Sequence, residues 1–264
     1  MESTTGDNMV YRAPKPNRAI PGMEDTPTTN VVENPVVLLF FGQSNSANHS
    51  ITPYTPPSEL GVYMSYNGLL YPASDPVYGA TMDPKIPNNR GSIMCRTAAR
   101  VASALNRKIV IIGAGCSGFR TIDWVNNAYG AYSFMEEQIN MLYTNHSLKP
   151  TLAIWHQGES DALDNATGVQ VFNNMTTIFD RVRQDVSPDI KFLVHVASIV
   201  KGLPKNEKVR LGQLAILHTR SDCYFASDTD TIGLYGRRDK THWNGNGVST
   251  VSERLALSIL KIIG

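Results

Sequence analysis

Residues 36–45 read Val-Val-Leu-Leu-Phe-Phe-Gly-Gln-Ser-Asn, an apolar run that ends in a glycine and three polar residues. A short, unbroken apolar run that stops at a turn signal is typical of a strand buried on both faces. Such strands form parallel sheets covered by helices, and ligands of these sheets bind beyond the carboxyl ends of the strands. The stretch therefore predicts an α/β fold and places Ser44 at its functional edge.

The chain that follows this run alternates short apolar segments with amphipathic ones. The predicted strands are residues 36–41, 108–112, 151–155, 190–196 and 223–226, and the predicted helices are residues 93–106, 130–143, 168–185, 207–218 and 247–263. In the third helix Val171, Met175, Ile178 and Val182 follow the spacing of one helical face. Because strands that alternate with helices indicate βα units, we expect a three-layer αβα sandwich with a flavodoxin-like, parallel, five-stranded sheet.

Composition and charge argue against two classes of partner. The 264 residues include 24 basic and 23 acidic ones without long blocks, so we expect no nucleic-acid partner. The apolar runs are too short to span a bilayer and the N-terminus is polar, so we expect no membrane insertion and no signal peptide. Cys95, Cys116 and Cys223 are widely spaced and odd in number, which predicts buried thiols rather than a disulfide framework or a zinc site.

Two segments depart from the βα pattern. Residues 1–34 are rich in Pro, Thr and Asn and have almost no apolar periodicity, which is typical of an extended arm. We expect this arm to dock on a neighbouring chain, of the same or another kind, and residues 35–264 to form one domain. Residues 50–90 interleave seven prolines with five tyrosines. A long excursion of this kind in a compact domain is more often functional than idle.

Polar residues follow the predicted strands at the edge where ligands bind. They lie in residues 42–45, 113–118 and 156–161 and in the loop 239–245 before the last helix. A serine becomes a nucleophile when a base lies within hydrogen-bond reach and a third group orients that base. Ser44 is the candidate nucleophile, His242 the candidate base and Asp239 the candidate orienting group.

Acyl transfer also needs hydrogen-bond donors for the oxyanion of its tetrahedral intermediate. Backbone N–H groups in a glycine-rich turn and a side-chain amide are the usual donors. The candidates here are the N–H groups of Ser44 and Gly118 and the amide of Gln157. Gly115 is the alternative to Gly118.

The four polar segments, in this order, resemble the SGNH hydrolase superfamily and in particular its sialate O-acetylesterase and carbohydrate esterase family six branch. Residues 41–45 are similar to the nucleophile segment of that branch, residues 155–161 match its Trp-His-Gln-Gly-Glu-Ser-Asp motif, and residues 239–242 resemble its Asp-x-x-His. The resemblance runs from about residue 35 to the C-terminus. Gln157 stands where the wider superfamily has Asn, as it does in the esterase branch, and Phe119 replaces a glycine of the second segment.

The resemblance implies a serine esterase that removes O-acetyl groups from a carbohydrate, either an acetylated polysaccharide or sialic acid. Ser44, His242 and Asp239 would form its triad, and neither a metal nor an organic cofactor is implied. Five further residues are candidates for contact with the substrate: Gln43, Asn45, Arg120, Glu159 and Trp243.

Several of these residues also have a purely structural interpretation. Glu159 could assist catalysis, or it could accept backbone hydrogen bonds or pair with a neighbouring Arg. Arg120 could hold an acidic sugar or cap its own loop. His49 and His156 could contact substrate or make local hydrogen bonds. Four tyrosines of the excursion could stack on sugar rings or pack beneath their own segment: Tyr63, Tyr66, Tyr71 and Tyr78.

Three functions stay open for the whole protein. An esterase with an extended arm suggests a deacetylating part of a phage tail, located on the virion, or otherwise a cytoplasmic or exported enzyme. The first alternative is a glycan-binding or structural virion module without activity, although a complete set of Ser44, Gln157, Asp239 and His242 argues against it. The second alternative is a lipase or thioesterase, which would need a long apolar groove.

Overall fold

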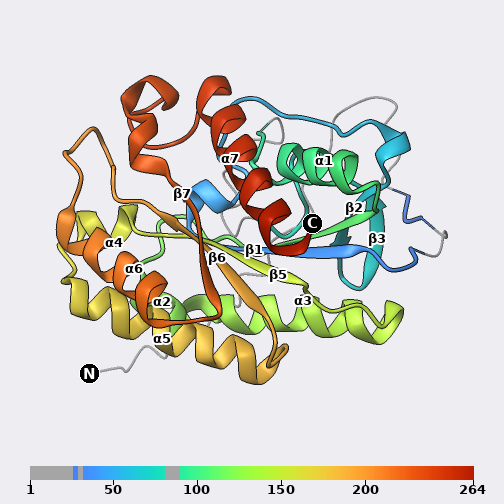
Figure 1. Cartoon of the computed structure of the whole chain (residues 1–264), viewed down its shortest axis with the longest axis horizontal. Helices are drawn as coiled ribbons and strands as arrows, with labels where there is room; N and C mark the ends of the chain where they lie inside the picture. The colour runs from blue at the N-terminus through green and yellow to red at the C-terminus, as the bar shows by residue number, and fades with distance from the viewer. Residues whose placement is uncertain (1–25, 29–31, 81–89) are drawn as a thin grey trace, which may run out of the picture.

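A seven-stranded sheet runs through the centre of the molecule (Figure 1). The computed structural model describes residues 26–28, 32–80 and 90–264. The strands are β1 (Val36–Gly42), β2 (Val62–Tyr66), β3 (Leu69–Pro72), β4 (Ile109–Gly113), β5 (Leu152–His156), β6 (Lys191–Val196) and β7 (Cys223–Asp228). Their order across the sheet is β3-β2-β4-β1-β5-β6-β7, and neighbouring strands are parallel except β2 and β3.

Helices cover both faces of the sheet. The α-helices are α1 (Met94–Leu105), α2 (Thr121–Val125), α3 (Ala131–His146), α4 (Glu159–Leu163), α5 (Gly168–Asp185), α6 (Glu207–Thr219) and α7 (Gly245–Ile263). Short 3-10 turns lie at Ser44–Ser46, Ser58–Leu60, Ala128–Gly130, Thr229–Ile232 and Leu234–Gly236. In Figure 1, α1 and α7 lie together on one face, and α3 and α5 lie on the other. The predicted three-layer αβα fold is confirmed, with β1 completely buried at its centre.

The predicted number of five strands is wrong, because the excursion contributes the hairpin of β2 and β3. Its turn consists of Asn67 and Gly68, whose φ angles of 49° and 73° both lie in the left-handed region. An Asn-Gly pair between apolar segments is the sequence signal for such a two-residue turn. The prolines around this pair predict an excursion from the βα pattern, and the Asn-Gly signal marks two strands within it.

The tyrosines of the excursion pack mainly within it. Tyr66, Tyr71 and Tyr78 are buried, and the ring of Tyr78 contacts the rings of Tyr66 and Tyr71 with centroid separations of 5.7 and 5.2 Å. Tyr63 in β2 is half-buried. The first three of these side chains therefore build the core under the hairpin and present no ring to a ligand.

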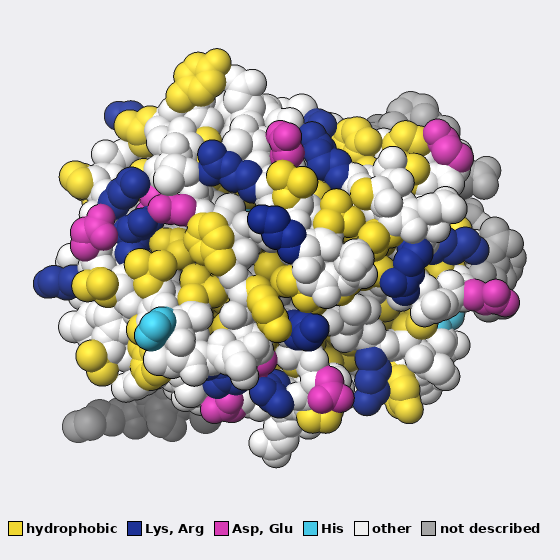
Figure 2. Space-filling view, viewed as in Figure 1, with side chains coloured by type: hydrophobic (Ala, Val, Ile, Leu, Met, Phe, Trp, Pro, Cys, Tyr) yellow, Lys and Arg dark blue, Asp and Glu magenta, His cyan; other side chains and the backbone are white. Residues whose placement is uncertain are grey.

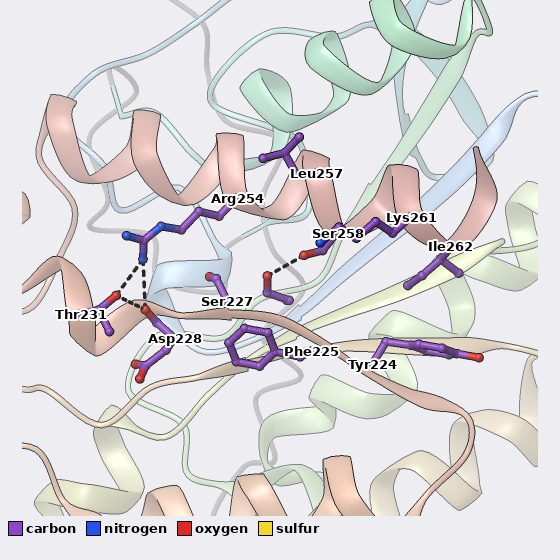
Figure 3. Close-up of a pocket in the computed structure, with 11 residues that line it drawn as sticks. Tyr224, Phe225, Ser227, Asp228, Thr231, Arg254, Leu257, Ser258, Lys261 and Ile262 are labelled. Carbon is purple, nitrogen blue, oxygen red and sulfur yellow. Dashed lines mark hydrogen bonds between the residues drawn. The ribbon is translucent and has the colours of Figure 1, made fainter.

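A cavity of about 590 Å³ lies between β7, the last strand of the sheet, and α7 (Figure 3). Ser258 Oγ donates to the Ala226 carbonyl at 2.8 Å, and Arg254 Nη1 donates to the Asp228 carbonyl at 3.2 Å. These two helix side chains use carbonyls that an open edge would offer to another strand. On the face that Figure 2 shows, Lys and Arg side chains are interspersed with apolar and acidic ones and form no basic stripe.

Three further expectations concern the cysteines, a membrane-spanning helix and the N-terminal arm. Cys95, Cys116 and Cys223 are free and buried, as predicted. Within the described part of the chain, no helix is long and apolar enough to cross a membrane. Thr28 donates its backbone N–H to the Leu70 carbonyl of β3, but residues 1–25 and 29–31 lie outside the described residues. Docking of the N-terminal arm on another chain therefore stays a prediction.

Candidate active site

The structure brings three of the candidate side chains into one hydrogen-bonded line. Ser44 is the second residue after the end of β1. Asp239 and His242 lie in the loop before α7. Ser44 Oγ is 2.9 Å from His242 Nε2, and His242 Nδ1 is 2.7 Å from Asp239 Oδ2. A serine, an imidazole and a carboxylate joined in this way can generate a nucleophilic alkoxide.

Asp239 holds both the ring and the backbone of this loop. Its Oδ1 accepts hydrogen bonds from the backbone N–H groups of His242 at 2.7 Å and Thr241 at 3.1 Å. Partial burial by itself would raise the pKa of Asp239, but the hydrogen bonds from His242 and the charge of Arg238 hold that pKa at about 2. The carboxylate therefore stays ionised at any neutral or mildly acidic pH.

The position of Ser44 depends on a close approach of two strand ends. Gly42 has a φ of 120°, and a Cβ at this position would lie 2.2 Å from the carbonyl oxygen of His156 at the end of β5. Only glycine fits such a contact. Gln43 N–H donates to the same carbonyl at 2.9 Å. The chain therefore turns sharply after β1 and carries Ser44 across the carboxyl edge of the sheet.

Four of the five candidates for substrate contact lie in the buried framework of the site, and their contact with a substrate stays a prediction. They are at most 2% exposed: Gln43, Asn45, Glu159 and Trp243. Gln43 Oε1 accepts from Gln157 Nε2 and from the Ser160 N–H, both at 3.0 Å. The polar residues after the strands turn inward because they satisfy the backbone and side-chain groups of the neighbouring loops.

Trp243 is buried between two side chains of the site. It is 1% exposed, and its ring packs edge-on against His156 at a centroid separation of 5.8 Å. The guanidinium carbon of Arg237 lies 4.3 Å from the centroid of the Trp243 ring. The tryptophan thus anchors the loop that carries His242.

Arg120 makes the structural contacts that the sequence left open. Its guanidinium group binds Asp123, with Nη2 2.8 Å from Oδ1, and its Nη1 lies 2.9 Å from Asp164 Oδ2. The Asp123 carboxylate also accepts the Arg120 backbone N–H at 2.9 Å. Arg120 therefore caps α2 in this structure.

Gln157 also departs from the expected geometry. It is fully buried, and its Nε2 lies within hydrogen-bond distance of Gln43 Oε1, Asp161 Oδ2 and the Phe119 carbonyl. An amide has two hydrogens, so the donors of Gln157 are already used inside the protein. Its side chain links the first three polar segments and does not present a donor to a substrate.

The remaining oxyanion candidates are backbone groups. Among the described residues, the N–H groups of Ser44 and Gly118 donate to no backbone carbonyl, so both are available to a ligand. Gly118 is exposed and has a φ of 74°, with open space where a Cβ would lie. Gly115 is buried, and a Cβ there would lie 2.7 Å from Ser46 Oγ. Gly118 therefore fits the role better than Gly115.

Glu159 is the centre of a buried charged cluster behind the catalytic candidates. Its Oε1 accepts from Asn45 Nδ2 at 2.7 Å and from His156 Nε2 at 2.8 Å. Asn45 Nδ2 also lies 3.3 Å from the Thr241 carbonyl. Burial by itself would raise the pKa of Glu159, but the charges of His156 and Arg237 and the two hydrogen bonds lower it to about 2. Glu159 thus ties the nucleophile turn to the loop of His242.

Replacing Glu159 by Gln is expected to destabilise the protein by about 3 kcal/mol at pH 7, because it removes the buried anion that is stabilised first by His156 and then by Arg237. The folded-state pKa is lowered, so the contribution of the carboxylate is complete above its ordinary pKa of about 4.5 and is lost as the pH falls toward 2. Urea denaturation of wild type and Glu159→Gln at pH 7 and pH 3.5 measures the loss of stability at each pH, with Glu207→Gln as the exposed control. An equal loss of stability at the two pH values would contradict the assignment.

Sequence reasoning did not single out Arg237, Arg238 and Thr241, which complete the loop. Arg237 Nη1 donates to the Thr241 carbonyl, and Arg238 Nη2 lies 3.5 Å from Asp239 Oδ2. The only available signal was their position beside Asp239 in the sequence. No group of three or more His, Cys, Asp and Glu residues in the described ranges is arranged to hold a metal ion.

A mostly parallel α/β sheet that carries Ser44, His242 and Asp239 in one hydrogen-bonded line at its carboxyl edge has the arrangement of a serine hydrolase. Residues 34–261 match the family model described as carbohydrate esterase, sialic acid-specific acetylesterase. The chain belongs to this family, and it is a carbohydrate O-acetylesterase.

Solved structures share the fold at low sequence identity. A protein from Arabidopsis thaliana is 19% identical, with a TM-score of 0.68 over 86% of this chain and 98% of that chain. NanS is 11% identical, with a TM-score of 0.65 over 89% of this chain and 99% of its own. A carbohydrate acetylesterase from Xanthomonas citri is 15% identical, with a TM-score of 0.53 over 84% of this chain and 55% of that chain. No curated protein matches the chain.

Proposed function

We propose that the protein hydrolyses O-acetyl esters of an acetylated polysaccharide or of sialic acid with Ser44, His242 and Asp239 as its catalytic triad. The observation that carries this proposal is the pair of contacts at 2.9 Å and 2.7 Å that joins the three side chains. The family membership of residues 34–261 supports the acetyl ester as the bond that is cleaved.

The reaction takes two acyl-transfer steps. Ser44 Oγ attacks the acetyl carbonyl while His242 Nε2 accepts the hydroxyl proton, and the N–H groups of Ser44 and Gly118 donate to the oxyanion. The tetrahedral intermediate expels the sugar oxygen, which receives the proton from His242. A water molecule then attacks the acetyl-serine as His242 takes one of its protons. Acetate leaves and the same proton returns to Ser44.

Positive charge beside the triad supports an acidic sugar as the substrate. Arg238 pairs with Asp239, and its Nε lies 3.4 Å from the His49 carbonyl. Arg90 lies close enough for its pKa to be lowered, first by burial and then by the charge of Arg238. Two guanidinium groups near one carboxylate leave an excess of positive charge, which favours a carboxylate on the sugar.

Acetate release from a panel of substrates tests this proposal. The panel contains O-acetylated sialic acid, a neutral acetylated polysaccharide and 4-nitrophenyl acetate. We expect hydrolysis of all three by the wild-type protein, fastest for the sialic acid ester, and none above background by Ser44→Ala. No hydrolysis above background by either protein would favour the glycan-binding module, and equal rates above background would exclude Ser44 as the nucleophile.

A lipase or thioesterase is less well supported. An apolar groove of about 520 Å³ lies between α5 and α6, and none of the triad residues lines it. An acyl chain bound there would have no contact with Ser44. Turnover of a long-chain 4-nitrophenyl ester at ten times the rate of the acetate ester would reverse this ranking.

We also propose that residues 1–34 attach the esterase to a neighbouring chain, as part of a phage tail. The Pro-rich composition of the segment is what supports this role. A variant that begins at residue 26 keeps Thr28 and Val32, which contact the domain. Light scattering should give a larger assembly for the full chain than for this variant. Equal masses would rule out the arm as the point of attachment in a homo-oligomer.

A further inference from the structure

We propose that His49 is a positioning residue whose ring, stacked on His242, holds the catalytic base in line with Ser44. The proposal rests on the triad of the proposed function. His49 follows the turn that carries Ser44, and its part in the site comes from this turn lying against the loop of His242.

The two imidazole rings lie face to face. Their centroids are 4.8 Å apart and their planes differ by 24°. His242 is held at its two nitrogens by Ser44 and Asp239, and those contacts fix the ring only within its own plane. A second ring on its face restricts rotation out of that plane, which the two hydrogen bonds leave free.

His49 is itself held at both backbone groups. Its N–H donates to the Ala47 carbonyl at 3.0 Å, and its carbonyl accepts from Arg238 Nε at 3.4 Å. The side chain is 5% exposed, and its Nε2 has no hydrogen-bond partner among the described residues. Among the described residues, the ring contact of His49 is therefore its stacking on His242.

The surroundings of His49 keep its ring neutral. Burial, followed by the charges of His242, Arg238 and Arg90, lowers the pKa of His49 to about 3, and only Asp239 acts in the opposite direction. A neutral aromatic face is compatible with the imidazolium that His242 becomes during the reaction, whereas a second cation at this separation would oppose it.

Three single substitutions in the full chain test the role. His49→Ala removes the ring, His49→Phe keeps a ring that cannot ionise, and His218→Ala removes an exposed histidine of α6 as a control. With 4-nitrophenyl acetate we expect His49→Ala to lower kcat by about 10- to 100-fold and to change KM by less than about twofold. His49→Phe should stay within about threefold of wild type, and His218→Ala should equal it.

A purely structural role predicts a different pattern. It would lower kcat of His49→Ala only in proportion to the folded fraction, which circular dichroism measures in the same samples. Wild-type kcat in His49→Ala, or an equal loss in the Ala and Phe variants, would overturn the proposal while Ser44→Ala stays inactive. If Ser44→Ala instead turns over as fast as wild type, the proposed function itself fails.

Nuclear magnetic resonance gives a readout that does not depend on turnover. The carbon-bound ring protons of His49 should keep the chemical shifts of a neutral imidazole from pH 8 to pH 5, because the pKa is about 3. The Cε1 proton of His242 should show a ring-current shift in wild type and His49→Phe that is absent in His49→Ala. The absence of such a shift in wild type would overturn the stacking, and titration of His49 above pH 6 would overturn the assignment of a neutral ring.

Discussion

Ser44→Ala is expected to lower kcat for acetate release by about 10⁴- to 10⁶-fold, the scale on which loss of the nucleophile affects serine hydrolases. The variant keeps the backbone N–H of residue 44 and the buried groups behind it. It loses the only side-chain oxygen within hydrogen-bond distance of His242 Nε2 among the described residues. Because one partly buried hydrogen bond is removed, the free energy of unfolding should fall by no more than about 1 kcal/mol.

Ser46→Ala is the matched control for this variant. Ser46 lies in the same 3-10 turn, is also buried, and donates its hydroxyl to the Gln43 carbonyl at 2.7 Å. We expect it to retain kcat within about tenfold of wild type, because its hydroxyl contacts no triad member. Initial rates of acetate release and urea denaturation measure both variants. A Ser44→Ala protein that kept a tenth of wild-type kcat would exclude Ser44 as the nucleophile.

Asp239→Asn is expected to lower kcat by about 10³- to 10⁴-fold with little change in the fold. His242 donates Nδ1–H to Asp239 Oδ2, which leaves Nε2 free to accept the proton of Ser44. An amide nitrogen at the position of Oδ2 would favour the other tautomer, with its proton on Nε2. The amide oxygen can still accept the backbone N–H groups of Thr241 and His242 and so preserve the loop.

The pH dependence of the wild-type rate follows from the same carboxylate. The pKa of Asp239 is held below its ordinary value, at about 2, so its ionised form is present above about pH 4 and is lost only as the pH falls toward 2. The ratio of the wild-type to Asp239→Asn rates should therefore stay far above one from pH 5 to pH 8. Asp180→Asn, in an exposed ion pair with Arg220, serves as the control. A ratio that fell toward one across this range would contradict the role.

Local sequence patterns predicted most of the fold. The apolar runs of β1, β4, β5, β6 and β7 and the amphipathic spacing of the five long helices need no information from the rest of the chain. The short helices α2 and α4 and the hairpin of β2 and β3 were not predicted. Helices α2 and α4 have too few turns to show an apolar periodicity in the sequence. Strands β2 and β3 lie among prolines and tyrosines, which interrupt the apolar pattern that predicts a strand.

The candidate site also has one part that the sequence predicted and one part that it did not. Ser44, Asp239 and His242 were indicated because strand ends of a parallel sheet meet at one edge, and the structure brings their side chains into contact. Gln43 and Glu159 stand in the same motifs but turn inward. Adjacency in a motif does not distinguish a side chain that reaches substrate from one that holds the loop, since both are polar and both follow a strand.

Residue patterns along the chain were sufficient to predict the class of fold, the edge at which the site lies and three candidate catalytic residues. The folded arrangement was needed to show which polar residues are buried, that the amide of Gln157 donates to internal acceptors, and that His49 lies on the face of His242. The physical reason is that apolar periodicity is a local property of the chain. Hydrogen-bond partners and ring contacts between residues almost two hundred positions apart exist only once the sheet has assembled.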